Sequence, residues 1–263
     1  MDVCKLFSLE GKVALVTGGA GKYGKCIVRG LAEAGATVVA GSRNIDACLT
    51  FAEECQAKGL DVRGDKIDLA DEASVNDLCE RMVSELGKVD ILVNNAVMRP
   101  TPPPSGSLAK CWSESMAVNA VGLCVCINTF LEHMIERKSG SIINIASMYG
   151  LVGQNPNMYI GTGSQSSRSG DYWFHKAGMI NYTRFLAARY GRFNIRVNCI
   201  SPGGFLGEGV EANEFAKVYS ERVPLGRMAN EDDIKGAAVY LASDASMYVT
   251  GHNLVVDGGW TIW

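Results

Sequence analysis

The 263-residue sequence has no run of about 18 purely apolar residues, because Asn119 and Asn128 interrupt its most apolar stretch, so no membrane-spanning helix is expected. Its 25 Lys and Arg do not outnumber its 28 Asp and Glu and form no basic block, which argues against a nucleic-acid partner. The nine Cys lack the spacing of metal ligands, so no metal site is expected. Their odd number and the absence of a secretory leader pattern favour reduced thiols in a cytoplasmic protein.

Short apolar runs alternate with longer amphipathic segments along the whole chain. The expected strands are 12–17, 37–42, 61–67, 90–94, 141–147, 194–201 and 253–256. The expected helices are about 22–34, 44–58, 71–86, 110–137, 172–190 and 231–243. This alternation predicts an α/β fold, a doubly wound parallel seven-stranded sheet with helices on both faces. For a chain of this length, we expect residues 1–263 to form a single domain.

Two segments interrupt the alternation. Residues 99–107 are rich in proline and cannot form a helix. Residues 149–171 are rich in Gly, Ser and Asn and are long for a connection in a compact α/β domain, which favours a functional loop beside the active site. We also expect residues 204–226 to cover the substrate as a lid.

A glycine-rich turn, TGGAGKYG at residues 17–24, follows the first expected strand and opens the first expected helix. Glycines there let the backbone approach a pyrophosphate, and the helix N-terminus offers unpaired N–H groups and a positive dipole end. This context favours a dinucleotide site over an ordinary tight turn. The residues of the turn expected to bind the dinucleotide are Gly18, Gly21, Lys22, Tyr23 and Gly24.

The second expected strand ends in Ser42 and Arg43, where a carboxylate would be expected to bind the ribose hydroxyls of NAD. Arg43 suits a 2′-phosphate instead, with Lys22 as a second positive charge. The favoured cofactor is therefore NADP(H), with NAD(H) as the alternative if Arg43 is an ordinary solvated charge. Asp68 and Leu69 close the third strand, where they are expected to edge and cap the adenine.

Four residues form the candidate catalytic group. Tyr172 and Lys176 are four positions apart at the start of an expected helix and so share one face. An ammonium stabilises a nearby phenolate, and such a tyrosine can exchange a proton with a carbinol oxygen. Ser147 ends the fifth strand, at the sheet edge where such folds bind ligands, and could hold the same oxygen. Asn119 is expected to be buried in an apolar helix, as a structural hydrogen-bonding group or as part of a water relay.

Six separated motifs resemble, in order and position, the short-chain dehydrogenase/reductase family, single-domain branch. They are TGGAGKYG, NNA at 94–96, Asn119, Ser147, Tyr172-x-x-x-Lys176 and SPGG at 201–204. The resemblance implies a Rossmann-like domain, a nicotinamide cofactor, hydride exchange with an alcohol carbon, and a dimer or tetramer. It further implies that Tyr172 is the acid/base, that Lys176 assists it and binds the nicotinamide ribose, that Ser147 orients the substrate oxygen and that Asn119 supports a water relay. Further cofactor contacts are implied for Asn94, Asn95, Ala96, Pro202 and Gly203.

The sequence departs from the family pattern at four places. Lys22 replaces the middle glycine of the usual turn, Val97 follows NNA in place of glycine, and Gly207 stands where threonine is common. Ser147 and Tyr172 are 25 positions apart, more than the family's common spacing. An insertion within 149–171 explains this separation without moving either residue.

The sequence allows three interpretations of the function, two of which differ in the substrate. The insertion carries many hydrogen-bonding side chains, which favours a sugar or sugar acid whose carboxylate an arginine, Arg99 or Arg168, could bind, unless this is an ordinary polar surface loop. The pattern YG…Y-x-G ahead of Tyr172-x-x-x-Lys176, together with the WTIW tail, resembles gluconate 5-dehydrogenase-like members of the family. The ending, with PLGRM and VDGG, equally resembles 3-oxoacyl-thioester reductases. A non-catalytic dinucleotide-binding sensor on the same fold is the alternative of another class.

Overall fold

The computed structural model describes residues 2–99, 107–163, 169–207 and 209–263. Within these residues, seven parallel strands form one sheet in the order β3-β2-β1-β4-β5-β6-β7, which confirms the expected fold. The strands are β1 (Val13–Thr17), β2 (Thr37–Ser42), β3 (Val62–Lys66), β4 (Ile91–Asn94), β5 (Gly140–Ile145), β6 (Ile195–Pro202) and β7 (Asn253–Val256).

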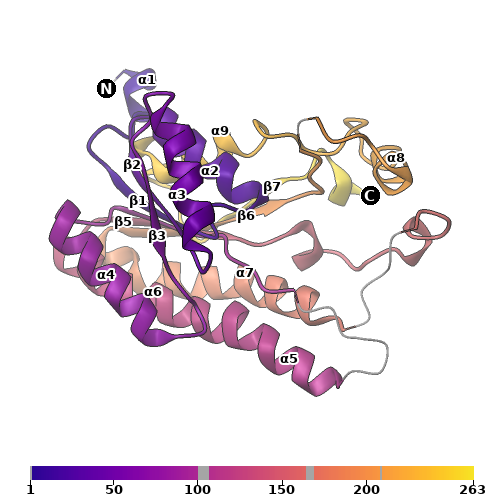
Figure 1. Cartoon of the computed structure of the whole chain (residues 1–263), viewed down its shortest axis with the longest axis horizontal. Helices are drawn as coiled ribbons and strands as arrows, with labels where there is room; N and C mark the ends of the chain where they lie inside the picture. Colours follow the sequence, from indigo (N-terminus) through magenta and orange to yellow (C-terminus); the bar gives the residue numbers. More distant parts are fainter. Residues whose placement is uncertain (1, 100–106, 164–168, 208) are drawn as a thin grey trace.

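Helices cover both faces of the sheet. They are α1 (Val3–Leu6), α2 (Lys22–Glu33), α3 (Ile45–Gln56), α4 (Glu72–Leu86), α5 (Leu108–Met116), α6 (Leu123–Arg137), α7 (Asp171–Tyr190), α8 (Glu214–Ser220) and α9 (Lys235–Ala242). Figure 1 shows α2, α3 and α9 on one side of the sheet and α4, α6 and α7 on the other. Each layer buries its own apolar core against the sheet, so β1 and β4 are buried along their whole length.

The expected elements are present, but most of their bounds differ from the structure by one or two residues. Three differences change the interpretation of the chain. The expected strand 141–147 ends at Ile145, so Ser147 lies two residues beyond β5. The expected helix 110–137 is divided into α5 and α6 by a π-helical stretch, Ala117–Gly122. The expected helix 231–243 begins only at Lys235, because the Asp233 carboxylate accepts the N–H of residue 230 at 2.7 Å and holds that segment in a turn.

The helical stretch Leu108–Arg137 is long and apolar enough to cross a membrane by length and composition alone. The core helix of a folded domain passes the same test, and 44% of its most apolar window is buried inside the protein. Phe130 and Leu131 of this stretch belong to the core beneath the sheet. These contacts favour a core helix.

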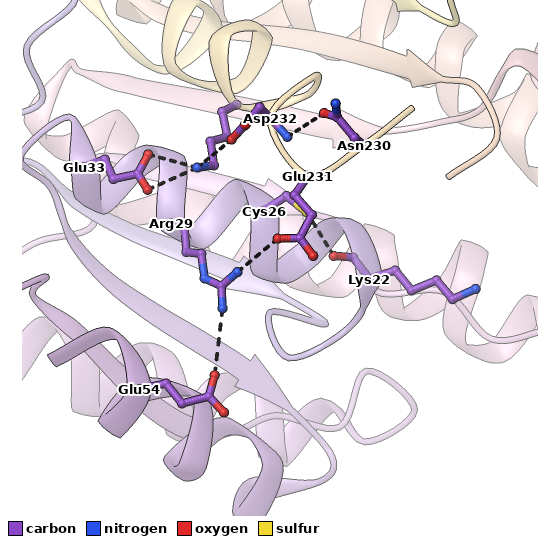
Figure 2. Close-up of polar contacts among 9 residues, drawn as sticks. Lys22, Cys26, Arg29, Glu33, Glu54, Asn230, Glu231 and Asp232 are labelled. Atoms are coloured by element: carbon purple, nitrogen blue, oxygen red, sulfur yellow. Dashed lines mark hydrogen bonds and ion pairs between the residues drawn. The ribbon is translucent and has the colours of Figure 1, made fainter. Parts of the chain in front are cut away.

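An ion-pair network joins three segments on the α2 face of the sheet. Arg29 on α2 lies 3.8 Å from Glu54 on α3 and 3.4 Å from Glu231 ahead of α9 (Figure 2). The Nζ of Lys235 on α9 lies 3.1 Å from the carboxylate of Glu33 at the end of α2. The helix that carries the glycine-rich turn is therefore tied to the chain that follows the expected lid.

Replacing Arg29 by Met is expected to lower the free energy of unfolding by about 1 kcal/mol, because the ion pairs disappear while the two carboxylates remain partly hydrated. Lys58→Met is the matched control, since Lys58 is exposed and has no ion pair among those of the described residues. The midpoint of urea unfolding measures both variants. Equal midpoints would mean that the network adds nothing to stability.

Candidate active site

The glycine-rich turn lies at the carboxyl end of β1, beside the point where the strand order reverses. Gly18 has a φ of +64°, a conformation that favours glycine. At Gly24 a Cβ atom would lie 2.1 Å from the carbonyl oxygen of Gly18, so no larger residue fits there. Gly21 caps α2 without a side-chain hydrogen bond. The turn therefore has the shape and the free helix N-terminus that a pyrophosphate requires.

Lys22 and Tyr23 have different places in this turn. The Lys22 side chain is exposed and extends away from the ion pairs of Arg29 (Figure 2). The Tyr23 hydroxyl donates to the carbonyl oxygen of Gly203 at 3.1 Å, and its ring lies 4.9 Å from that of Phe205. Tyr23 thus ties the turn to the end of β6, a contact that the sequence did not indicate.

The end of β4 beside the glycine-rich turn is fixed by Thr17. Its hydroxyl accepts the backbone N–H groups of Asn95 and Ala96, each at 3.1 Å. The Asn95 amide nitrogen donates to the carbonyl oxygens of Thr17 and Gly18 at 3.1 and 3.0 Å. The end of β4 is therefore held directly beside the glycine-rich turn.

The residues expected at the adenosine end lie on neighbouring strand ends. The carbonyl oxygen of Ser42 accepts the N–H of Ile67 at 3.1 Å, which brings the ends of β2 and β3 together. Arg43 is exposed, and none of the ion pairs between described residues includes it. The Asp68 carboxylate accepts a backbone N–H two residues further on at 3.0 Å, and Leu69 is buried. The guanidinium of Arg43 is thus available to a ligand, whereas the Asp68 carboxylate already caps its own turn.

Tyr172 and Lys176 lie on the first turns of α7. Lys176 is 2% exposed, and its Nζ donates to the carbonyl oxygen of Ile145 at 2.5 Å. The same Nζ lies 5.7 Å from the centroid of the Tyr172 ring. Burial, followed by the positive charge of Arg99, lowers the pKa of Lys176 from 10.5 to about 7. The buried amine therefore changes its charge near neutral pH.

Ser147 lies at the same edge of the sheet. It is 5% exposed, and its Oγ accepts the N–H of Tyr149 at 3.1 Å, which starts a 3₁₀ turn. Within that turn, a Cβ atom on Gly150 would lie 2.9 Å from the backbone of Lys176, so the turn packs directly on α7. The turn that begins at Ser147 therefore lies against α7 in space, although 25 positions separate Ser147 from Tyr172 in the sequence.

Asn119 lies in the π-helical stretch and holds the chain that follows β4. Its Oδ1 accepts the N–H of Met98 at 2.8 Å, and its Nδ2 donates to the carbonyl oxygen of Met98 at 2.7 Å. Both groups of its side chain therefore serve a structural clamp. This favours the structural interpretation for the side chain, and a role in a water relay stays a prediction.

A buried polar chain beside Tyr172 was not anticipated from the sequence. The Asp171 carboxylate, 3% exposed, accepts the hydroxyls of Ser115, at 2.5 Å, and of Ser169. The Asn119 Nδ2 donates to Ser115 Oγ at 3.0 Å and lies 3.4 Å from His175 Nδ1, so it links these two residues. Burial, followed by the charge of Lys176, lowers the pKa of His175 to about 4, so this histidine is neutral at physiological pH. In the sequence, Asp171 is only the last residue of the expected loop 149–171, and the structure places it in the first turn of α7.

Arg99 makes a polar contact with the Tyr172 hydroxyl. Its Nη2 donates to the Tyr172 Oη at 2.7 Å, and its guanidinium carbon lies 4.0 Å from the centroid of the same ring. The sequence places Arg99 near the substrate but gives no sign of this contact. Arg168, the other arginine expected there, lies outside the described residues.

The expected loop 149–171 and lid 204–226 pack against each other through aromatic rings. The ring of Tyr159 lies 5.2 Å from that of Phe215 on α8, and the hydroxyls of Tyr149 and Tyr159 are 3.5 Å apart. The two tyrosine hydroxyls thus face each other, and the lid aromatics contact the loop. Residues 164–168 and 208 of these segments lie outside the described residues.

The chain matches, over residues 21–261, the protein family described as enoyl-(acyl carrier protein) reductase. It is 34% identical to D-threitol dehydrogenase of Mycolicibacterium smegmatis over 97% of this chain and 95% of that protein. The protein is a member of the short-chain dehydrogenase/reductase family. The resemblance expected from the six motifs is confirmed.

Other members of the family show its chemical range. A 3-oxoacyl-[acyl-carrier-protein] reductase of Aquifex aeolicus is 32% identical, over 95% of this chain and 98% of that protein. The structure of a gluconate 5-dehydrogenase from Burkholderia cenocepacia, in complex with NADP and tartrate, superposes with a TM-score of 0.86 at 32% identity, covering 100% of both chains. This short-chain dehydrogenase/reductase is an NAD(P)-dependent oxidoreductase, which favours the enzyme over the non-catalytic sensor.

Proposed function

We propose that this enzyme uses NADP(H) to interconvert a secondary alcohol and a ketone on a sugar or sugar acid. Tyr172 exchanges the hydroxyl proton, Ser147 holds the substrate oxygen, and Lys176 supports the phenolate and binds the nicotinamide ribose. The observation that carries this proposal is the bond from the buried Lys176 Nζ to the carbonyl oxygen of Ile145. This bond anchors the start of α7 to the strand end that leads into Ser147.

The residues around the glycine-rich turn fit a nicotinamide dinucleotide. The missing Cβ atoms at the turn and the free N-terminus of α2 suit the pyrophosphate. When bound, the nicotinamide supplies or accepts the hydride. The residues proposed to hold the cofactor are Gly18, Gly21, Lys22, Tyr23, Gly24, Ser42, Arg43, Asp68, Leu69, Asn95, Ala96, Tyr172, Lys176, Pro202 and Gly203.

In the direction of alcohol oxidation, Tyr172 accepts the hydroxyl proton of the substrate. The Nζ of Lys176 lies 5.7 Å from the centroid of the Tyr172 ring, and when it is protonated it supports this step electrostatically. Ser147 donates a hydrogen bond to the substrate oxygen and stabilises the charge that develops on it. Asn119 holds the segment around Met98 with its side chain. Its role in a water relay to solvent is part of the proposal.

A sugar acid is supported by the relatives that act on polyols and sugar acids and by the polar composition of residues 149–171. The structural neighbour holds tartrate, a hydroxy dicarboxylate. A 3-oxoacyl-thioester reductase is the second candidate, favoured by the A. aeolicus relative. Turnover assays on polyols, sugar acids and 3-oxoacyl thioesters decide between them, and activity on the thioesters alone would exclude the sugar proposal.

The preference for NADP(H) rests on Arg43. We expect Arg43→Asp to lower kcat/KM for NADP about 100-fold and to raise it for NAD, because the carboxylate repels a 2′-phosphate and accepts hydrogen bonds from ribose hydroxyls. The control is Arg192→Asp, since Arg192 is also exposed but precedes β6 at the opposite edge of the sheet. If both variants keep the cofactor preference of the parent enzyme, Arg43 does not read the 2′-phosphate.

The enzyme is proposed to act as a dimer or tetramer. Phe174 and Phe185 on α7 are 64% and 55% exposed, and Trp263 at the C-terminal end is 81% exposed. Large exposed apolar side chains of this kind are typical of subunit contacts. Light scattering on the purified enzyme measures the mass of the assembly.

A further inference from the structure

We infer that Arg99 binds a carboxylate attached one or two carbons from the reacting carbinol, so that the substrates are 2- or 3-hydroxy acids and the corresponding oxo acids. The inference deepens the proposed function and rests on the role given there to Tyr172. It distinguishes these acids from neutral polyols, from thioesters and from acids whose carboxylate is remote from the reacting carbon.

The first support is the position of the guanidinium relative to the phenol. Arg99 Nη2 lies 2.7 Å from Tyr172 Oη, and Cζ lies 4.0 Å from the ring centroid. The side chain thus makes both a hydrogen bond to the phenol oxygen and a cation–π contact with its ring. Any substrate oxygen that binds Tyr172 Oη must approach within a few ångströms of this guanidinium.

The second support is the unbalanced charge around Tyr172. None of the ion pairs between the described residues includes Arg99. The nearby Asp171 carboxylate is buried and already accepts two serine hydroxyls, Ser115 and Ser169. Among the described residues, no carboxylate forms an ion pair with Arg99, which therefore presents its positive charge at the phenol oxygen. An anionic substrate supplies the missing partner.

The third support is reach. Suppose that a carbinol oxygen replaces Arg99 at the Tyr172 hydroxyl. In a 2-hydroxy acid the carboxylate carbon is bonded directly to the carbinol carbon, so the two carbons are only about 1.5 Å apart. Its two oxygens then fit the planar fork of the guanidinium, which binds carboxylates in a bidentate manner. A carboxylate several bonds further away would lie beyond Arg99 unless the side chain left the site. Binding of the acid also draws the guanidinium off Tyr172 Oη, which frees that oxygen to accept the hydroxyl proton.

The reaction leaves the carboxylate unchanged. The carbinol carbon loses a hydride to the oxidised nicotinamide, and its hydroxyl proton passes to Tyr172. The products are the oxo acid, the reduced nicotinamide and one proton, and the reverse reaction consumes them.

Two substrate series test the inference. Threonate and threitol have the same four-carbon chain with and without a carboxylate, and the 2-, 3- and 4-hydroxypentanoates move the secondary alcohol away from a constant carboxylate. We expect kcat/KM for threonate to exceed that for threitol by about 100-fold, and the 2- or 3-hydroxypentanoate to exceed the 4-isomer by at least tenfold. In Arg99→Gln both ratios should fall close to one, mainly through a higher KM for the acids, whereas Arg99→Lys should restore part of each ratio.

The control is Arg192→Gln, a distant exposed arginine, which should keep both ratios. The inference is wrong if the parent enzyme turns over no member of either acid series, if threitol matches threonate, or if Arg99→Gln keeps the ratios. Threitol or thioester turnover that depends on Tyr172, with no preference for the acids, would leave the proposed function standing and remove only the role of Arg99.

Discussion

Replacing Tyr172 by Phe is expected to lower kcat by about 1000-fold, because the change removes only the oxygen that exchanges the substrate proton. The phenyl ring keeps its contacts with Trp173 and His175, whose ring centroids lie 5.8 and 5.2 Å away. The fold and the residues proposed to hold the dinucleotide should therefore be preserved. Steady-state kinetics give kcat, and titration of nicotinamide fluorescence gives the affinity for NADPH, which we expect to change by less than a few-fold.

Tyr149→Phe is the matched control for this variant. Its hydroxyl also lies in the region of the expected active site, but it faces Tyr159 at 3.5 Å rather than Arg99. The control should keep kcat within about tenfold of the parent enzyme, since it removes no group assigned to proton exchange. A Tyr172→Phe variant as active as Tyr149→Phe would show that another group carries the proton.

Lys176→Met is expected to abolish turnover and, without cofactor, to stabilise the fold below pH 7. The pKa of Lys176 is 10.5 ordinarily and about 7 in the folded chain, so the unfolded chain binds more protons between these values. The free energy of unfolding therefore rises with pH across that window and is lowest below it, where a buried ammonium costs a few kcal/mol. Met fills similar space without a charge. The variant should therefore lose both the cost of burying an ammonium and the rise of the unfolding free energy between pH 7 and 10.5 that Lys176 causes.

Urea unfolding at several pH values between 6 and 10 measures the slope in the parent enzyme and in the variant. Lys138→Met is the control, because Lys138 is exposed in the turn after α6. It should retain the parent's dependence on pH. The expectation is wrong if Lys176→Met is less stable than the parent at pH 6 and keeps the parent's change of unfolding free energy with pH. That result would mean that burying the protonated amine does not destabilise this fold.

The sheet and the dinucleotide turn could be predicted from the sequence because their signals are local. β2 and β7 have the expected bounds, since each is a short apolar run between turn residues. The glycines at 18 and 24 are required by the backbone itself, through a positive φ and a close carbonyl oxygen. Tyr172 and Lys176 were found because their spacing places them on one face of a helix.

Contacts between distant segments could not be predicted in the same way. The π-helical stretch Ala117–Gly122 was not expected from the sequence. Its end packs on a segment distant in sequence, since a Cβ atom on Gly122 would lie 2.1 Å from the carbonyl oxygen of Leu69. The contact of Arg99 with Tyr172 joins residues 73 positions apart. The late start of α9 depends on hydrogen bonds to the Asp233 carboxylate, not on helix propensity.

A crystal structure of the unmodified enzyme with oxidised cofactor and a 2-oxo acid, a combination between which no hydride can pass, tests the roles of Tyr172 and Ser147 most directly. We expect the ketone oxygen within about 2.6–3.2 Å of both Tyr172 Oη and Ser147 Oγ, with the carbonyl carbon about 3–3.5 Å from the nicotinamide. A ketone oxygen held by other groups, with Tyr172 Oη turned away from it, would show that these two residues do not bind the reacting oxygen.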